Sequence, residues 1–208
     1  MRFCFASNKI NHDWVSLVES YKRYVNKNSV VLEIGASNIE RTKELGKFCK
    51  EVIAVELVPE RLPKGAGNIK HLIGDWQNLS EFIQPNSIDI VVSSHVIEHI
   101  PDDLKAINEL FRVLKPGGAA FLNTPNRKRL VRSIIEIFTG ERKFPFWEHQ
   151  REYIESDLLH LLGASDFKKY KVIPLVFGVH GGPIFLYFES VIPPLRRYAN
   201  YWEIHLFK

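Results

Sequence analysis

The sequence of 208 residues predicts an α/β fold built on a doubly wound, mainly parallel sheet. Three observations predict this fold. Short apolar runs without alternation recur along the chain, and such runs suit strands that are covered on both faces. Segments with apolar residues at helical spacing separate these runs. Gly35 follows the first run, and Glu56 ends the second run 21 residues after that glycine, which is the length of one βαβ unit.

The first part of the chain predicts two helices and three strands. Apolar residues at helical spacing, from Trp14 to Val25, predict a helix over about His12–Val25. The run that starts at Val30 predicts the first strand, and Gly35 lets the backbone turn tightly beside a ligand. We then expect a helix around Arg41–Cys49 and strands at Val52–Val55 and Ile69–Ile73.

The same alternation continues beyond the third strand. Asn78–Ile83 predicts a short helix, and Ile88–Val92 predicts a fourth strand. Asp102–Leu114 carries apolar residues on one helical face, and Pro116-Gly117-Gly118 ends that helix. A fifth strand follows at Ala119–Leu122. Glu155–Leu162 predicts a further helix, which Ser156 or Glu155 caps and Gly163 stops. From Lys171 onward we expect strands that return to the sheet, the last of them at Trp202–Phe207.

Between Pro125 and about Gln150 the pattern changes. A basic group precedes the apolar helical stretch Ile134–Phe138, and the aromatic segment FPFWEHQ follows Gly140. We expect residues 125–150 to form a substrate lid above the sheet edge, inserted in a single domain of residues 1–208. The basic group is either a solvated face or a site that attracts a carboxylate, phosphate or sugar nucleotide; it consists of Arg127, Lys128, Arg129 and Arg132.

Composition excludes several classes of protein. A net charge of +4 permits an anionic partner without requiring one. Cys4 and Cys49 have neither disulfide-framework nor zinc spacing, and the N-terminus has no continuous apolar segment of the kind found in secretory signals. The apolar stretch Val172–Ile192 is broken by prolines, glycines and charge, so we expect a cytoplasmic protein without stable membrane insertion. We expect no nucleic-acid partner, because the basic residues form no long stripe. Oligomeric state cannot be read from the sequence.

Polar residues follow each of the predicted strands. Ligands in such sheets bind beyond the carboxyl ends of the strands, where the strand order reverses. These polar residues therefore predict the ligand site; they are Glu33–Asn38, Glu56, Gly74–Trp76, Ser93–His99 and Asn123–Asn126.

The residues around Gly35 help to choose between two nucleoside ligands. A dinucleotide site requires the motif G-x-G-x-x-G, whose glycines let the backbone bind a pyrophosphate. Here Ser37 and Glu40 stand at the second and third of those positions, and Glu33 precedes the turn. Carboxylates disfavour a nearby anion. S-adenosylmethionine, with a ribose, a sulfonium and an amino group, fits better than a nicotinamide dinucleotide. A structural βαβ turn without any ligand is the remaining interpretation.

Taken together, the motifs resemble a class I S-adenosylmethionine-dependent methyltransferase of the type 11 family, over about Ser29–Lys171. The resemblance rests on VLEIGAS, IAVEL, IGDW, DIVVSSHVIEHIPD, LFRVLKPGGAAFLNTPN and EHQREYIESDLLHLLGASDF, in this order. It implies a Rossmann-like sheet of seven strands with an antiparallel last strand, S-adenosylmethionine as cofactor and S-adenosylhomocysteine as product. The family's first motif has glycines where this chain has Ser37 and Ile39, so the loop takes a wider path or binds the cofactor less tightly.

The resemblance also implies which residues bind the cofactor. Glu56 would accept hydrogen bonds from both ribose hydroxyls, and Asp75 from the adenine amino group, with Trp76 stacking on the ring or touching its edge. Glu33 would lie near the methionine part. Without a ligand, Glu56 would be a solvated carboxylate, Asp75 a turn residue and Trp76 part of the core. The full predicted set is Glu33, Gly35, Ala36, Ser37, Glu56, Leu57, Asp75, Trp76, Ser93 and Ser94.

Histidines supply the candidates for catalysis, because methyl transfer needs a base only when the acceptor must lose a proton. His95, Glu98 and His99 share one face if they lie on a helical turn. This group is structural, or one histidine is a general base, or the three side chains hold a divalent metal; we predict no metal. His149 and Tyr153 either contact the acceptor as a base or hydrogen-bonding pair, or cap the following helix and seal the lid.

The leading hypothesis is a methyltransferase acting on an oxygen, or with less support a nitrogen, of a small-molecule acceptor. Sugars, quinone precursors and lipid-like molecules all remain as acceptors. Aromatic residues in the lid and tail, such as Phe144 and Phe177, favour an apolar or sugar-stacking pocket, although core packing explains many of them. The alternative is a non-catalytic, regulatory protein that binds S-adenosylmethionine or S-adenosylhomocysteine through the same fold.

Overall fold

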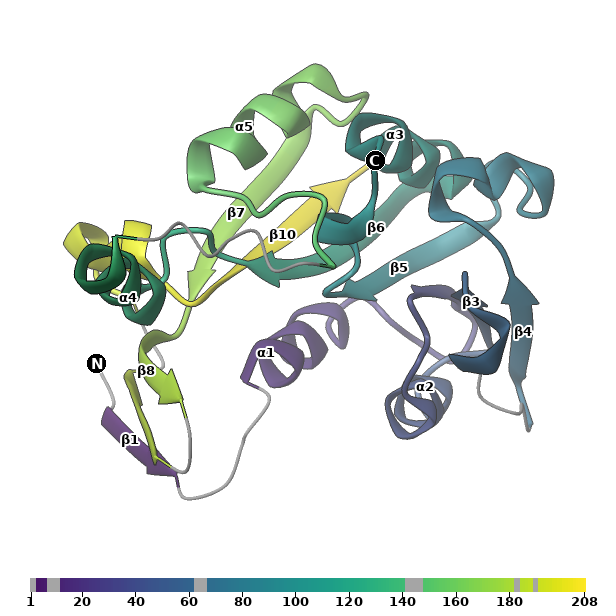
Figure 1. Ribbon diagram of the computed structural model, residues 1–208. Helices are drawn as coiled ribbons and strands as arrows, with labels where there is room; N and C mark the ends of the chain where they lie inside the picture. The colour runs from purple at the N-terminus through teal and green to yellow at the C-terminus, as the bar shows by residue number, and fades with distance from the viewer. Residues whose placement is uncertain (1–2, 7–11, 62–66, 141–147, 182–183, 189–190) are drawn as a thin grey trace.

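The computed structural model describes residues 1–208 except 1–2, 7–11, 62–66, 141–147, 182–183 and 189–190. Seven strands form one sheet in the order β4-β3-β2-β5-β6-β10-β7 (Figure 1). They are β2 (Val30–Ile34), β3 (Glu51–Glu56), β4 (Ile69–Ile73), β5 (Ile88–Ser94), β6 (Leu114–Pro125), β7 (Lys169–Leu175) and β10 (Tyr201–Phe207). The first five pair in parallel, and β10 runs antiparallel to both β6 and β7. The predicted seven-stranded sheet with an antiparallel last strand is confirmed.

Helices cover both faces of this sheet, as the apolar strands require. α1 (His12–Tyr21) and α2 (Ile39–Gly46) pack on one face with Val31, Val52 and Phe121. α3 (Asp103–Val113) and α5 (Glu155–Ala164) pack on the other face with Leu32, Val55 and Trp202. Neighbouring residues Val31 and Leu32 therefore point into different cores, because side chains alternate along a strand.

The centre of the sheet forms a topological switch point. β2 is paired with β3 on one side and with β5 on the other, so the chain leaves the two central strands in opposite directions. Three short 3₁₀ helices follow the strands that surround this point. They are η1 (Pro59–Arg61) after β3, η2 (Trp76–Glu81) after β4 and η3 (Ile97–His99) after β5. The switch point lies where the sequence predicts the ligand site.

Several predicted boundaries differ in the structure. The first helix ends at Tyr21 instead of Val25, and the predicted short helix at Asn78–Ile83 is η2. Pro116-Gly117-Gly118 does not separate α3 from the fifth strand, because β6 already begins at Leu114. Ile88 pairs with Leu114 and Ile90 with Ala119, so the glycines form an irregularity within the strand. The helix at Glu155 is capped by Asp157, whose Oδ2 accepts a hydrogen bond from the Ile154 N–H at 3.0 Å.

A second, three-stranded sheet was not predicted. It contains β1 (Phe3–Ala6), β9 (Ile184–Phe188) and β8 (Phe177–Gly181), all antiparallel in the order β1-β9-β8. The expectation that the whole tail returns to the main sheet is therefore wrong: β7 and β10 do so, whereas β8 and β9 pair with the N-terminal strand. This pairing joins segments at opposite ends of the chain, and no local pattern in the sequence specifies it.

Two further elements lie beside this small sheet. α4 (Leu130–Thr139) comes from the predicted lid and packs against β8, and η4 (Pro193–Tyr198) precedes β10. The lid aromatics Phe144, Phe146 and Trp147 lie outside the described residues. Among the helices that the structure describes, none has the length and apolar character needed to cross a membrane.

Candidate active site

Gly35 forms the turn at the end of β2, and its position requires a glycine for two reasons. Its φ of +77° lies in the left-handed region. A Cβ atom on Gly35 would also lie 2.3 Å from Cγ2 of Val96. The Gly35 N–H donates to the Val55 carbonyl at 2.9 Å, and the Ala36 N–H donates to the same oxygen at 3.3 Å. The turn is thus tied to β3, and Ala36 is buried beneath it.

α2 begins directly after this turn, and its N-terminus is already capped. Oδ1 of Asn38 accepts hydrogen bonds from the N–H groups of Glu40 and Arg41 at 3.1 and 3.3 Å. A pyrophosphate on a helix N-terminus needs such N–H groups to be available. The capped helix therefore agrees with the argument against a dinucleotide.

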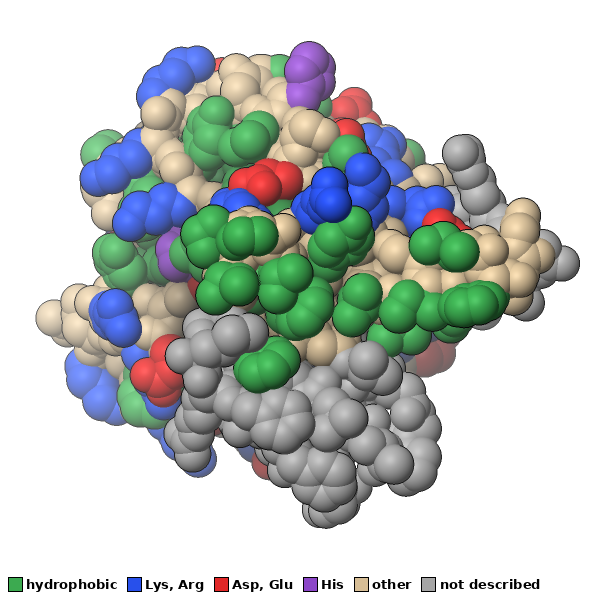
Figure 2. All heavy atoms as spheres, turned by 90° about the vertical axis from the view of Figure 1, so that its left-hand side faces the viewer, with side chains coloured by type: hydrophobic (Ala, Val, Ile, Leu, Met, Phe, Trp, Pro, Cys, Tyr) green, Lys and Arg blue, Asp and Glu red, His purple; other side chains and the backbone are tan. Residues whose placement is uncertain are grey.

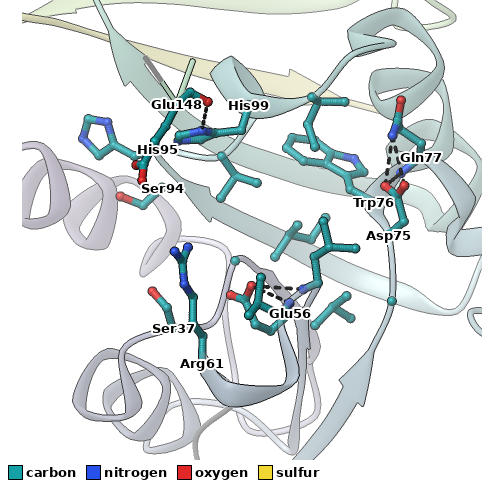
Figure 3. A pocket seen from close by; sticks show the side chains of 18 of the residues that line it. Ser37, Glu56, Arg61, Asp75, Trp76, Gln77, Ser94, His95, His99 and Glu148 are labelled. Atoms are coloured by element: carbon teal, nitrogen blue, oxygen red, sulfur yellow. Dashed lines mark hydrogen bonds between the residues drawn. The ribbon is translucent and has the colours of Figure 1, made fainter. Parts of the chain in front are cut away.

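A cavity of about 370 Å³ lies beyond the carboxyl ends of β2, β3, β4 and β5 (Figure 3). This is the size of a small-molecule site. In Figure 3, Asp75 and Gln77 lie at one end, Ser94 and His95 at the other, and Glu56 between them. The cavity brings together most of the predicted site: Gly35, Ser37, Glu56, Leu57, Asp75, Trp76, Ser94, His95 and His99 all line it. Glu33 and Ser93 line an adjoining hollow of about 40 Å³, together with Ser37 and Ser94.

Glu56 is held in place at the end of β3. Its Oε1 accepts hydrogen bonds from the N–H groups of Leu57 and Val58 at 3.0 and 3.2 Å. The side chain is nearly buried but lines the cavity. Two backbone bonds fix the orientation of the carboxylate, which is the preorganisation expected of a binding group.

Asp75 caps η2 at the opposite end of the cavity. Oδ1 accepts from the Gln77 N–H at 2.8 Å, and the Gln77 side-chain amide donates to both carboxylate oxygens at 3.2 and 3.0 Å. Trp76 is only 2% exposed, and its Nε1 donates to the Ala106 carbonyl at 2.8 Å. The indole is therefore fixed against α3 as part of the core, while the residue also forms part of the cavity wall.

Glu33 is a buried acid next to the turn. The residue is 5% exposed, and its Oε2 has no hydrogen-bond partner among the described residues. Burial raises the pKa of Glu33 to about 7, against smaller lowering effects of Thr42 and Arg41. Oγ of Ser94 is likewise buried without a partner in the described part of the chain, whereas Oγ of Ser93 donates to the Ile34 carbonyl at 3.2 Å. Two polar atoms at the same end of the site are thus available to a ligand.

The residues after β5 place two histidines at the cavity. His95 has a left-handed φ of +56°, and its Nδ1 lies 3.2 Å from Oε1 of the fully buried Glu98. Oε2 of Glu98 accepts from the Thr124 hydroxyl at 3.0 Å. Nδ1 of His99 lies 2.8 Å from the Glu148 carbonyl. Because a carbonyl only accepts, Nδ1 carries the proton in neutral His99 and Nε2 is the basic nitrogen.

His149 lies beside His99 but does not line the cavity. The two rings meet edge to face, with centroids 4.8 Å apart. Nδ1 of His149 lies 2.9 Å from Oε1 of the buried Glu152, and Glu152 is ion-paired with Arg132, which is also buried. Burial lowers the pKa of His149, so the imidazole is neutral near pH 7.

Tyr153 takes the structural role of the two that were predicted. Its hydroxyl is buried, donates to Asp103 Oδ2 at 2.9 Å and lies 3.3 Å from the Ile97 carbonyl. Burial raises the pKa of Tyr153 further above its ordinary value. His149 and Tyr153 share no helical turn, because α5 begins only at Glu155. The Tyr153 hydroxyl therefore contacts η3 and α3, and Tyr153 is not among the residues that line the cavity.

The three side chains considered as one alternative for a metal site, His95, Glu98 and His99, are not the group of possible ligands that the structure brings together. Ligand atoms of Glu98, His99 and His149 lie within 4.8 Å of one another. His95 is absent from this set, although its Nδ1 lies 3.2 Å from Oε1 of Glu98.

Sequence reasoning missed three contributors to the site. Gln77 bonds to Asp75, and Arg61 of η1 projects into the cavity beside Ser37 (Figure 3). Gln77 and Arg61 both follow the end of a strand, and this position in the sequence could have identified them. The pairing of Arg132 with Glu152 has no such signal, because Glu152 follows the lid 20 residues later in the chain and Arg132 belongs to a basic group that is typical of a solvated face.

Strand order and cavity position define the fold of the class I S-adenosylmethionine-dependent methyltransferases. A family model described as a methyltransferase domain matches residues 32–122. The structure is similar to a SAM-dependent methyltransferase from Archaeoglobus fulgidus, with a TM-score of 0.65, 15% identity and 95% of both chains covered. It is also similar to a SAM-dependent methyltransferase from Aquifex aeolicus, with a TM-score of 0.62, 13% identity and coverage of 96% and 99%.

Two curated relatives match about half of the chain. One, from Mycolicibacterium smegmatis, is named "Probable S-adenosylmethionine-dependent methyltransferase" and is 34% identical over 117 residues, which cover 51% of this chain and 42% of the relative. The other is the ubiquinone biosynthesis O-methyltransferase of Xanthomonas campestris pv. campestris, 29% identical over 104 residues, with coverage of 47% and 43%. The matches thus span less than half the length of these relatives. The family model, the first of these relatives and the solved structures all support the class I S-adenosylmethionine-dependent methyltransferase that the motifs predict. The cofactor of this family is S-adenosylmethionine.

Proposed function

We propose that this protein transfers a methyl group from S-adenosylmethionine to an oxygen of a small molecule, with nitrogen as the less favoured acceptor atom. One observation carries the proposal. Three acids at neighbouring strand ends, Glu33, Glu56 and Asp75, line one cavity and the hollow beside it. Their order along the cavity matches the methionine, ribose and adenine parts of a single extended cofactor.

The adenosine half fits the end formed by Asp75, Trp76 and Leu57. Asp75 would accept a hydrogen bond from the adenine amino group. That bond would replace one that the side-chain amide of Gln77 now donates to the Asp75 carboxylate. The side of Trp76 that faces the cavity and the exposed Leu57 would contact the ring. Glu56, oriented by two backbone bonds, would accept from both ribose hydroxyls.

The methionine half fits the end formed by the turn and the end of β5. The unpartnered Oε2 of Glu33 and Oγ of Ser94 would receive the amino group, and the ionised Glu33 would attract its positive charge. Gly35 lets the backbone approach closely, Ser37 and Ser93 line the adjoining hollow, and Ala36 is buried beneath the turn. A buried polar atom without a hydrogen-bond partner costs free energy unless a ligand supplies that partner. The two unpartnered oxygens therefore support a ligand with a cationic hydrogen-bond donor here.

Bound S-adenosylmethionine supplies an activated methyl group on a sulfonium, which leaves as a neutral thioether after in-line attack. The protein contributes chiefly by positioning, for which up to about 7–11 kcal/mol is available. His99 is the favoured base, because it lines the cavity and its basic Nε2 is set by the bond at Nδ1. Nε2 would take the acceptor's hydroxyl proton as the oxygen forms its bond to the methyl carbon. His95 and His149 would flank it, held by Glu98 and Glu152.

The acceptor class is inferred from the relatives and the lid. One relative is named an O-methyltransferase, which favours oxygen as the methylated atom. We propose that the lid of residues 125–150, carried by one methyltransferase domain, selects among sugars, quinone precursors and lipid-like molecules. We infer no nucleic-acid partner.

A non-catalytic protein that binds S-adenosylmethionine or S-adenosylhomocysteine is the second candidate. Ser37 and Ile39, at positions where the family has glycines, favour it. The two candidates share the binding site and differ only in methyl transfer.

The deciding experiment supplies labelled S-adenosylmethionine and a metabolite panel to the purified protein. The proposal predicts a labelled product whose formation is weakened by Glu56→Ala, and not by Glu51→Ala at the other end of the same strand. Cofactor binding without transfer to any panel member would favour the regulatory candidate. If Glu56→Ala leaves cofactor affinity unchanged, the ribose assignment is wrong.

A further inference from the structure

The orientation of α4 is the reverse of that of an ordinary surface helix. Its charged residues point inward: Arg132 is 1% exposed and Glu136 22%. Arg132 pairs with Glu152 and with Glu136 at 3.4 Å, and Arg127 pairs with Glu136 at 2.9 Å. A surface helix normally buries its apolar side and exposes its charges. Here the buried ion pairs hold the helix with its apolar side outward.

Four large apolar side chains form the exposed face of this helix, here named the α4 face. Ile137 and Phe138 are 78% and 85% exposed, and Ile134 and Ile135 are 41% and 40% exposed. Figure 2, which shows the side of the molecule that carries α4, has hydrophobic side chains gathered in a continuous patch, with several Lys and Arg and fewer Asp and Glu along its upper border. Contiguous apolar surface of this kind marks a site of interaction.

Basic residues of the described part of the chain border the α4 face. Glu136 is the only acid within α4, and two arginines neutralise it. Lys128 is exposed just before the helix, and Arg197 is exposed on η4. The Asn126 side chain donates to the Arg197 carbonyl at 3.0 Å, which holds η4 against the segment that leads into α4. An apolar helix face with a cationic border is complementary to an anionic lipid surface.

We propose that the α4 face docks this protein on an anionic lipid membrane, with the helix lying in the plane of the interface. The helix has 10 residues, about 15 Å at 1.5 Å per residue, and so lies on the surface and does not span it. A second copy of the chain is a poorer occupant. A two-fold interface would bring Lys128 and Arg197 of one copy towards the same residues of the other, and like charges repel.

Docking in this orientation has a consequence for the candidate active site. Arg132 projects from the buried side of α4 to Glu152, and Glu152 contacts His149 beside the cavity. The membrane would therefore lie on the lid side of the site, where a lipid-like acceptor could enter. This consequence rests on the proposed function, whereas the docking itself does not.

Sedimentation with lipid vesicles tests the proposal without any methyl transfer. We expect the protein to bind vesicles of mixed phosphatidylglycerol and phosphatidylcholine, to bind pure phosphatidylcholine weakly, and to be released by salt. Removing the two most exposed side chains in Ile137→Ser/Phe138→Ser should weaken the binding by about tenfold or more. Lys128→Glu/Arg197→Glu should weaken it on anionic vesicles only.

A matched control and a folding control make the result decisive. Ile73→Ser replaces an equally apolar residue, 57% exposed on β4 at the far end of the sheet, and should bind vesicles like the unmodified protein. Both serine variants should keep the thermal unfolding midpoint and S-adenosylhomocysteine affinity of the parent. Absence of binding to anionic vesicles overturns the proposal, as does equal binding by the parent and the α4 variant. Self-association that only the α4 variant loses would assign the face to a second copy and also overturn it.

Discussion

Replacing Glu33 with glutamine should stabilise the protein at alkaline pH while weakening cofactor binding. The buried carboxyl has a pKa of about 7 in the fold, against 4.5 as its ordinary value. Its protonated form therefore contributes stability that is fully present below pH 4.5 and lost as the pH rises through 7. At about 1.4 kcal/mol per pH unit, this gap corresponds to about 3 kcal/mol. Glu33→Gln keeps the shape of the neutral form and should recover this free energy at pH 8.

Urea unfolding at pH 8 and pH 4.5 measures the effect. We expect Glu33→Gln to exceed the parent by about 3 kcal/mol at pH 8 and to match it at pH 4.5. Glu81→Gln, at an exposed site on η2, should change little at either pH. A difference between Glu33→Gln and the parent that is the same at both pH values would refute the reasoning.

The same acid should make cofactor binding dependent on pH. If the ionised Glu33 receives the amino group of S-adenosylhomocysteine, affinity follows the ionised fraction, which rises about tenfold between pH 6 and pH 8 for a pKa of about 7. Glu33→Gln should bind more weakly at pH 8 and lose this dependence. Identical pH profiles for the two proteins would remove Glu33 from the binding site.

Three other substitutions test separate parts of the site. Gly35→Ala should lower the free energy of unfolding in urea by more than about 2 kcal/mol, because the new Cβ would clash with Val96 in addition to the cost of a left-handed φ. Gly67→Ala is the control: at φ +70° with open space around it, it should show only the cost of the left-handed φ, about 1 kcal/mol. His99→Gln should lower kcat for methyl transfer by about 10²–10⁴ while S-adenosylhomocysteine affinity stays constant, and an unchanged kcat would exclude it as the base. Glu152→Gln, which leaves the buried Arg132 without its charged partner, should lower the free energy of unfolding by about 3–5 kcal/mol, and a neutral effect would show that the pair is dispensable.

Local patterns predicted the sheet and the acids that follow its strands. Parallel strands that are buried on both faces have continuous apolar sequences. Glu56 and Asp75 stand at the ends of two such sequences, and the carboxyl ends of parallel strands lie at one edge of the sheet, so the pattern predicted that these two acids line one cavity. The tight turn at Gly35 was likewise predictable, although its second cause, the close approach of Val96, appears only in three dimensions.

Contacts between distant segments could not be predicted in this way. β1 pairs with β9 across nearly the whole chain, and such pairing leaves no periodic signal in either strand. Arg132 belongs to a basic cluster that resembles a solvated face, yet Glu152 and Glu136 draw it inward. Tyr153 follows His149 by four residues, which is the spacing of partners on a helix. However, α5 begins only at Glu155, and the Tyr153 hydroxyl is buried in a hydrogen bond to Asp103.

The most direct test of the cofactor site is a calorimetric titration of the protein with S-adenosylhomocysteine. The arrangement of Glu33, Glu56 and Asp75 predicts saturable binding to one site in the micromolar range, and Glu56→Ala should weaken it by about tenfold or more as the bonds to the ribose are lost. Glu51→Ala should bind like the parent. Absence of saturable binding in the micromolar range would contradict the assignment of this cavity to S-adenosylmethionine.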